Sequence, residues 1–463
     1  MTDVLTLNGN VLVISGSVLT GDMGGSEEID LTPGVDFIDY DGSTMERWAT
    51  ADVAGKSALP DNPTHTGLTA QGWNWSLADI KAYMVNHPDA ILTVGQMYTT
   101  TSGDTEIDCT FPAESLSPYL AICPNGTVEV DWGDGSAKDT VTGTSYTSLR
   151  YTQHTYATAG DYTVTIHVIS GGFGFYSNSS AYSTVFSYRN ALRTSLEYSS
   201  CITAIRLGSN VQLNSSALNG LINLKTITLP NNITYANSSQ WLSRCFNLQS
   251  LSLPPTLTSI PTYCFQYCCN LKKLSLPNTI TTINSSAFSN CPSLIYLTIP
   301  DTVTYINGSF NTCTNLQLLI LSNNLATITS STFSGCYNLS FLTLPSNLTS
   351  AGTSAFNSCY SLRYLTINDG LTDIPSGLFS NCQSLISLTI PAGVTTINSN
   401  AFSYAYSMRE LHFQATTPPT IANSNAFTGL STDCIIYVPT GTLSDYTSAT
   451  NYPSSGTYTY MEE

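Results

Sequence analysis

The chain has 463 residues, only 10% of them charged, and a formal net charge of −17. Its first 200 residues hold 7 Lys and Arg against 23 Asp and Glu, a balance of −16. This acidic front argues against nucleic-acid binding, which needs basic surface. No apolar run approaches the ~20 residues that span a bilayer, and the N-terminus lacks the basic and apolar regions of a Sec signal. We expect several domains, no membrane insertion, and export either after removal of a signal or by another route.

Residues 1–35 are expected to form a short β segment for attachment or oligomerisation, because apolar residues alternate around Asn8-Gly9, a hairpin signal. Residues 36–105 are expected to form a small α+β module. Ser43 or Thr44 is predicted to cap a short helix through Ala54, and Ser76 and Asp79 have the spacing of a capping box for a second helix that ends before Pro88. The role of this module stays open.

A resemblance appears within this module, in three blocks: Asp-Tyr-Asp-Gly at 39–42, residues 58–68, and Gln-Gly-Trp-Asn-Trp-Ser-Leu-Ala at 71–78. Together they resemble an N-terminal module of gut-bacterial and bacteriophage structural proteins that also carry leucine-rich repeats. The resemblance covers about 70 residues. It implies attachment to other virion proteins through the N-terminal region.

Residues 106–170 are expected to be all-β. They contain Trp132-Gly-Asp-Gly135, then His154-x-Tyr156, and then Gly160-x-Tyr162-x-Val164. This pattern resembles the PKD (polycystic kidney disease) domain, an immunoglobulin-like β-sandwich that usually acts as a spacer or contact module. From the residues alone, Gly133–Gly135 predicts a tight turn. Residues 171–200 are expected to form a transition, with a Gly/Ser/Tyr-rich loop at 171–183 and a helical stretch at 192–196.

Residues 201–413 repeat one pattern of about 23 residues, and residues 414–463 are expected to form a terminal capping coil and tail. The L-x-x-L-x-L spacing at this period is the signature of leucine-rich repeats. The phrase Ala-Phe-x-x-Cys-x-x-Leu-x-x-Leu-x-Leu-Pro resembles the BspA-like (treponemal) subclass, known from microbial surface adhesins and phages. The expected fold is mainly β, a solenoid of nine or ten coils preceded by a PKD-like sandwich and the α+β module.

Cysteine recurs at one position of this repeat. The position is occupied at Cys245, Cys268, Cys291, Cys313, Cys336, Cys359 and Cys382. A metal site needs ligands that converge from several directions, whereas these residues form one column. Leu221 and Ala405 occupy the same position in flanking coils, which predicts buried apolar filler. Pairing of Cys109 with Cys123 stays open, because it depends on an oxidising milieu.

The residues flanking the second leucine of each repeat should point outward from the sheet, by the two-residue alternation of a strand. In the middle coils this outward face is aromatic, aliphatic and hydroxylic. The candidate ligand-binding residues are Tyr296, Thr298, Leu318, Ile320, Phe341, Thr343, Tyr364 and Thr366. Three interpretations stay open: contact with a ligand, mutual support along the sheet, and burial against a second copy of the chain.

Catalytic and cofactor motifs are missing from the sequence, and five histidines are scattered along it. His154 is expected to make a structural hydrogen bond. We therefore expect no enzyme, no cofactor and no metal. The predicted function is recognition or adhesion at a virion surface, where a fibre or decoration protein contacts host-surface glycan or protein. The alternatives are a secreted BspA-like bacterial surface adhesin and an accessory part of a glycan-processing enzyme.

Overall fold

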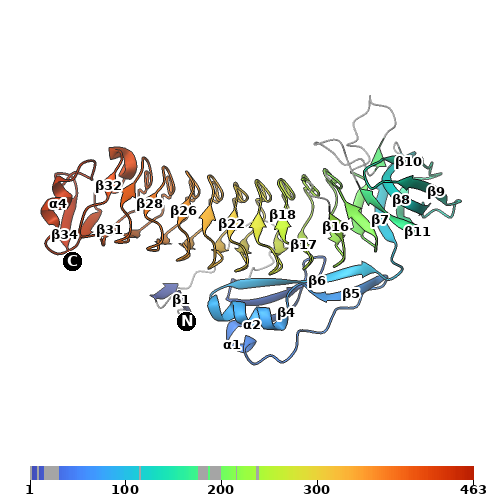
Figure 1. Ribbon diagram of the computed structural model, residues 1–463, viewed down its shortest axis with the longest axis horizontal. Coiled ribbons are helices and arrows are strands. Elements are labelled where there is room, and N and C mark those ends of the chain that lie inside the picture. The colour runs from blue at the N-terminus through green and yellow to red at the C-terminus, as the bar shows by residue number, and fades with distance from the viewer. Residues whose placement is uncertain are drawn as a thin grey trace.

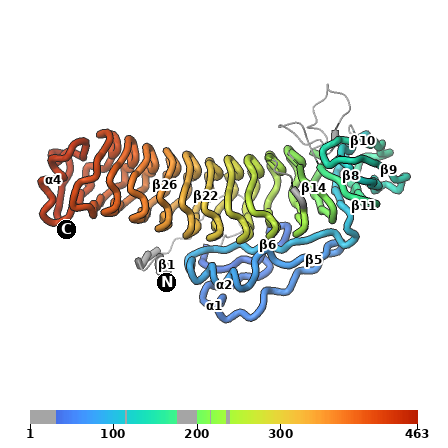
Figure 2. The backbone as a smooth tube through the Cα atoms, viewed as in Figure 1, coloured from blue at the N-terminus to red at the C-terminus, as the bar shows by residue number. Residues whose placement is uncertain are grey.

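The computed structural model describes residues 3–7, 10–14, 31–113, 116–175, 186–187, 200–214, 216–235 and 239–463. The fold is mainly β, as predicted. A long solenoid of about 11 coils forms the body (Figure 1). The coils stack in register along the whole repeat region, as the backbone trace makes plain (Figure 2).

Each coil contributes one strand to a parallel array that carries the predicted outward face, which we call the face sheet; its hydrogen-bond ladder is broken between β15 and β17 and between β19 and β21. Leucines of the repeat, such as Leu297 and Leu342, point inward from it and are buried. Its strands are β13 (Ile202–Arg206), β15 (Thr226–Thr228), β17 (Ser250–Ser252), β19 (Lys273–Ser275), β21 (Tyr296–Thr298), β23 (Leu318–Ile320), β25 (Phe341–Thr343), β27 (Tyr364–Thr366), β29 (Ser387–Ile390), β31 (Glu410–Phe413), β33 (Ile435–Val438) and β34 (Thr459–Glu462).

A second row of short parallel strands lines the opposite side of each coil. Its members are β14 (Val211–Leu213), β16 (Thr234–Tyr235), β18 (Ser259–Ile260), β20 (Thr282–Ile283), β22 (Tyr305–Ile306), β24 (Thr327–Ile328), β26 (Ser350–Ala351), β28 (Asp373–Ile374), β30 (Thr396–Ile397) and β32 (Thr420–Ile421). Inside the solenoid, the repeated phenylalanines from Phe265 to Phe427 stack on one another with ring centroids 5.1–5.8 Å apart. One coil cannot bury these rings alone, so the stack itself forms the core.

The cysteine column lies in this core, as predicted for filler. All seven thiols are free and have no exposed surface. Each donates a weak hydrogen bond to a carbonyl of the preceding coil, as Cys291 Sγ does to Phe265 O at 3.3 Å. Burial raises the pKa of the Cys245 and Cys313 thiols to about 12. Cys109 and Cys123 are both free and buried as well.

Residues 105–175 form a β unit, here called the front unit, that closes the N-terminal end of the solenoid. Its strands are β7 (Thr105–Phe111), β8 (Tyr119–Asp131), β9 (Asp139–Thr144), β10 (Arg150–Gln153) and β11 (Gly160–Phe175), and the short β12 (Phe186–Ser187) pairs with β8. Strand β7 lies between β11 and β13, so one sheet continues from the front unit into the first coil. Because β11 runs to Phe175, the predicted loop at 171–183 is wrong for its first residues, and the helical prediction at 192–196 lies outside the described residues.

Residues 34–101 form the N-terminal module. Its sheet has the order β4 (Thr44–Ala49), β3 (Gly34–Ile38), β6 (Ile91–Thr100) and β5 (Leu68–Trp73), with α1 (Thr50–Val53) and α2 (Leu77–Asn86) beside it. The second predicted helix is confirmed, since Ser76 Oγ accepts from Asp79 N at 3.1 Å and the helix ends before Pro88. The first is wrong over most of its length: β4 pairs with β3 through Ala49, and only one helical turn follows.

The two chain ends have their own elements. At the N-terminus, β1 (Asp3–Leu7) and β2 (Asn10–Ile14) pair as the predicted antiparallel hairpin, with Leu7 opposite Asn10. At the C-terminus, the 3-10 helix η1 (Ser424–Phe427), β33, α4 (Leu443–Ser448) and β34 complete the last coils. Tyr446 of α4 is buried and donates to Ala415 O at 2.6 Å, so this helix covers the end of the core.

Candidate recognition face

The N-terminal module packs across strands β15 to β21 of the face sheet and covers part of the predicted recognition face. It lies beneath the N-terminal half of the solenoid as drawn, with β6 against these strands (Figure 1). The contact is close because Gly95 of β6 has no side chain: a Cβ there would lie 2.1 Å from Ser252 Oγ and 2.5 Å from Ser252 Cβ.

Polar side chains join the module to backbone groups of successive coils. Asn74 Nδ2 donates to Leu253 O at 3.0 Å, Trp75 Nε1 to Leu276 O at 2.8 Å, and Tyr83 OH to Ile299 O at 3.2 Å. These three donors bond three consecutive coils at one repeat position. The spacing of the module's donors thus matches the repeat of the solenoid, which fixes the module in one register.

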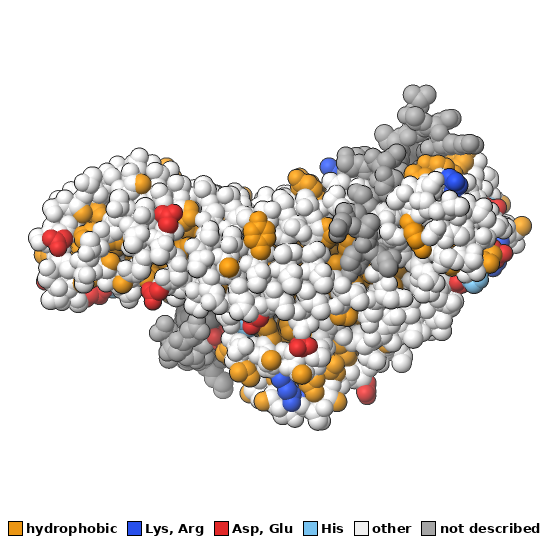
Figure 3. Space-filling model, viewed as in Figure 1, with side chains coloured by type: hydrophobic (Ala, Val, Ile, Leu, Met, Phe, Trp, Pro, Cys, Tyr) orange, Lys and Arg blue, Asp and Glu red, His pale blue; other side chains and the backbone are white. Residues whose placement is uncertain are grey.

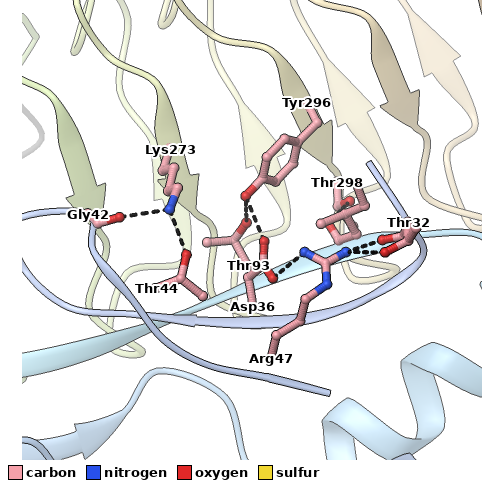
Figure 4. Close-up of polar contacts among 10 residues, drawn as sticks. Thr32, Asp36, Gly42, Thr44, Arg47, Thr93, Lys273, Tyr296 and Thr298 are labelled. Carbon is pink, nitrogen blue, oxygen red and sulfur yellow. Dashed lines mark hydrogen bonds and ion pairs between the residues drawn. The ribbon is translucent and has the colours of Figure 1, made fainter. Parts of the chain in front are cut away.

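Lys273 and Tyr296 of the face sheet bond polar groups of the module in the same interface. Lys273 Nζ donates to Gly42 O at 2.8 Å and to Thr44 Oγ1 at 2.7 Å (Figure 4). Tyr296 OH donates to Asp36 Oδ2 at 3.1 Å, while Arg47 Nη1 bonds the other oxygen of that carboxylate at 2.6 Å. Burial raises the pKa of Asp36, opposed by the charge of Arg47. Burial also raises the pKa of Tyr296, as does the neighbouring charge of Asp36.

The expectation that the middle coils are open is therefore wrong at Tyr296, whose side chain is 7% exposed. Thr298 is half-buried and donates to Ile91 O at 2.7 Å. Ile320 is half-buried and packs against the apolar core of the module. The covering partner is the chain's own N-terminal module rather than a ligand or a second copy.

The remaining candidates lie beyond the edge of the module. Leu318, Ile320, Phe341 and Thr343 line a hollow of about 100 Å³ whose other wall is the segment Asn86–Ala90. Phe341 and Tyr364 stack face to face, with ring centroids 5.2 Å apart and planes 7° apart. Tyr364 is 43% exposed, and Thr366 is also exposed.

We call the outward side chains of β23 to β31 the open face. Its members are Leu318, Ile320, Phe341, Thr343, Tyr364, Thr366, Ser387, Thr389, Glu410 and His412. Their backbone positions form continuous rows, because the strands pair in register. The surface of the solenoid carries few charged side chains in the view of Figure 3, in agreement with the sequence composition.

Sequence reasoning missed the residues that hold the module in place. Asn74 and Trp75 directly precede the second helix and Tyr83 lies within it, where the sequence predicts only local structure. The available signal was the pair of tryptophans at 73 and 75 flanking Asn74, followed by the glycine at 95 within an apolar strand. Glycine inside a strand often marks a close backbone approach.

Each of the five histidines lies within bonding distance of a carboxylate. His154 Nε2 lies 2.7 Å from Asp134 Oδ2 and its ring stacks on Trp132, which confirms the structural role predicted for it. His87 Nε2 lies 2.9 Å from Asp301 Oδ1 and so belongs to the interface of module and solenoid.

Within the described ranges, no group of three or more His, Cys, Asp or Glu side chains could hold a metal ion. No helix in the same ranges has the length and apolar character needed to span a membrane.

The fold defines a repeat protein, a solenoid of stacked coils whose face sheet is partly covered by the N-terminal module. The family model for the BspA-type leucine-rich repeat region matches residues 193–310 and 307–432, and the chain belongs to this family. Proteins of this type are typically binding proteins of the cell surface or the extracellular space.

Solved structures with similar chains are leucine-rich repeat proteins as well. A protein from Bacteroides ovatus is 23% identical with a TM-score of 0.45, and the match covers 56% of this chain and 65% of that one. A leucine-rich cell surface protein from Faecalibacterium prausnitzii is 21% identical with a TM-score of 0.32, covering 53% and 81%. The T. pallidum leucine-rich repeat protein is 29% identical over 29% of this chain and 63% of its own, with a TM-score of 0.28. No curated protein matches the sequence.

Proposed function

We propose that the chain is a non-enzymatic recognition protein that binds a bacterial surface through its open face. The observation that carries this proposal is the stacked ring pair of half-buried Phe341 and exposed Tyr364, next to the hollow at the edge of the module. Exposed aromatic rings flanked by hydroxyls suit partners that bind through apolar contact and hydrogen bonds. The weakly charged surface of the solenoid favours the same mode of binding over long-range electrostatic attraction.

Within this proposal the N-terminal module has a supporting role. It is held by bonds to three consecutive coils, so it restricts recognition to the coils between β23 and β31. The hollow exists only because Asn86–Ala90 forms a wall above the sheet. The module thus shapes one border of the binding surface as well as covering the coils before it.

The test is binding of the purified chain to bacterial cells, measured with a fluorescent label. Replacing Phe341 and Tyr364 together by serine is expected to reduce binding at least tenfold. The matched control replaces Tyr337 and Tyr360 by serine, because these rings belong to the same two coils, stack at 4.9 Å and are 40% and 38% exposed, but precede the face strands. Equal loss in both variants, or no loss in the first, would contradict the proposal.

We further propose that the chain acts at a virion surface, as a fibre or decoration protein attached through its N-terminal region, with the front unit as a PKD-like spacer. The resemblance of residues 39–78 to a module of phage structural proteins supports this location. Mass spectrometry of purified phage particles tests this virion location. The envelope fraction of uninfected cells is the comparison. Recovery from the envelope alone would instead support a bacterial surface adhesin.

A further inference from the structure

The ring row of the open face ends at Tyr364. In the first outward column, Phe341 stacks on Tyr364, and the next two residues are Ser387 and Glu410. Serine is too short to continue the row, so the face of the Tyr364 ring that points toward Ser387 has no aromatic neighbour in the column. Two strand spacings separate Tyr364 from Glu410, about 10 Å, which leaves space above Ser387 for one ring.

Hydroxyl groups and charged groups surround this space. Thr366 and Thr389 belong to the second outward column, beside Tyr364 and Ser387. On the far side, Glu410 has a side chain that is 52% exposed, and its carboxylate lies 3.7 Å from His412 Nε2. His412 Nδ1 lies 2.9 Å from Glu463 Oε1, and its ring stacks on Tyr437 with centroids 4.5 Å apart. Neighbouring side chains therefore hold His412 in place on the far side of the space.

The charges near this space nearly balance. Arg409 is paired with Asp433 at 2.9 Å, and His412 contacts both Glu410 and Glu463. Arg363 directly precedes Tyr364 and is exposed. A strongly charged ligand would therefore find no complementary field, whereas a neutral ligand would find a ring face, hydroxyls and one accessible carboxylate.

We propose that the space above Ser387 is a subsite for one neutral sugar ring. The apolar face of the sugar stacks on Tyr364, where it continues the ring row, and Glu410 accepts hydrogen bonds from its hydroxyls while Thr366 and Thr389 contact its edge. Aromatic stacking combined with hydroxyl and carboxylate partners suits a saccharide better than an aliphatic peptide. This inference rests on the proposed function and assigns the ligand class of the same open face.

The test replaces Ser387 by phenylalanine, whose ring would occupy the proposed subsite. Ser387→Phe is expected to extend the Phe341–Tyr364 stack without disturbing the core, because position 387 faces outward. The matched control is Gln383→Phe in the same coil, which extends the other ring row formed by Tyr337 and Tyr360. Tyr364→Ala and Glu410→Gln remove the ring face and the carboxylate, so the test does not depend on one variant folding.

The probes are soluble tetrasaccharides of glucose, mannose, galactose and N-acetylglucosamine. Their binding is measured by saturation-transfer NMR, and a triarginine peptide is tested in the same way as a charged alternative ligand. At least one tetrasaccharide is expected to bind the unaltered chain and the Gln383→Phe variant equally. Its affinity should fall at least tenfold in Ser387→Phe and in Tyr364→Ala, and by a smaller factor in Glu410→Gln.

Three results would overturn the inference: no tetrasaccharide binds, Ser387→Phe and Tyr364→Ala bind as well as the unaltered chain, or only the arginine peptide binds. Cell binding separates this failure from failure of the proposed function. If labelled chains adhere to bacteria and Ser387→Phe adheres equally, the subsite is wrong and the recognition function stands. If a saccharide binds above Ser387 but the chain adheres to no cells, the recognition function is wrong and the subsite stands.

Discussion

Replacing Gly95 by alanine is expected to loosen the N-terminal module from the solenoid. The added Cβ would lie 2.1 Å from Ser252 Oγ, 2.5 Å from Ser252 Cβ and 3.1 Å from Ser275 Cβ. Rotation of the Ser252 hydroxyl relieves only the first of these contacts. Two carbon atoms need about 3.5 Å, so β6 must retreat from the face sheet by roughly 1 Å.

The cost of this retreat follows from the contacts of the interface. Overpacking by one methyl group costs about 1–3 kcal/mol. A shift of ~1 Å also weakens the hydrogen bonds of Asn74 to Leu253 O and of Trp75 to Leu276 O, each contributing about 1 kcal/mol. The docking free energy should therefore fall by about 1–5 kcal/mol, which adds about 1–3 kcal/mol for overpacking to at most about 2 kcal/mol for the two weakened hydrogen bonds.

Amide hydrogen exchange with mass spectrometry measures the effect. In Gly95→Ala, exchange should accelerate in peptides containing Asn74 and Trp75, while the strands near the C-terminus stay unchanged. Gly55→Ala in the same module is the control, because its Cβ would meet only Asp52 O at 3.6 Å. The added change Ser252→Gly removes the clashing Cβ and should restore slow exchange. Unaltered exchange in Gly95→Ala, or no rescue by Ser252→Gly, would refute the predicted contact.

Three further predictions concern the rest of the molecule. Phe333→Ala removes a fully buried ring stacked between Phe310 and Phe356, so calorimetry should show a loss of about 3–5 kcal/mol, and a loss below about 1 kcal/mol would contradict the ring core. Because burial raises the pKa of Cys291 and Cys313, a thiol reagent at pH 8 should leave both unmodified until the chain is denatured; rapid native labelling of either would argue against the buried column. Hydrogen bonds from Ser136, foremost, and from His154 lower the pKa of Asp134 to about 2 from its ordinary 3.8, so its contribution to stability is present above about pH 4 and is lost as the pH falls toward 2. Asp134→Asn should therefore flatten the dependence of the thermal midpoint on pH between 5 and 2, and an unchanged slope would count against this linkage.

The repeat region was predictable from the sequence because each coil buries the same positions as its neighbours. Residue type and period alone place Phe333 or Cys336 in the core. The second helix of the module was also predictable, since Ser76 and Asp79 cap it locally. Strand β4 was not predictable, because its residues show little alternation between apolar and polar side chains and its pairing with β3 determines its conformation.

The covered part of the recognition face could not be predicted from the repeat pattern. Tyr296 and Tyr364 occupy the same repeat position, and each is followed by Leu-Thr. One is buried and the other exposed because residues far earlier in the chain dock on the first of them. That docking depends on the fit of Gly95, Asn74 and Trp75 to specific coils, which no local pattern encodes.

Hydroxyl-radical footprinting of these two tyrosines measures the division of the face sheet most directly. Tyr364 is 43% exposed and Tyr296 is 7% exposed, so the oxidation rates of their rings should differ several-fold in the folded chain. After denaturation the two rates should become equal, and in Gly95→Ala the rate at Tyr296 should rise. Equal oxidation of both rings in the folded chain would mean that the module does not cover the solenoid and that the recognition face extends over all the middle coils.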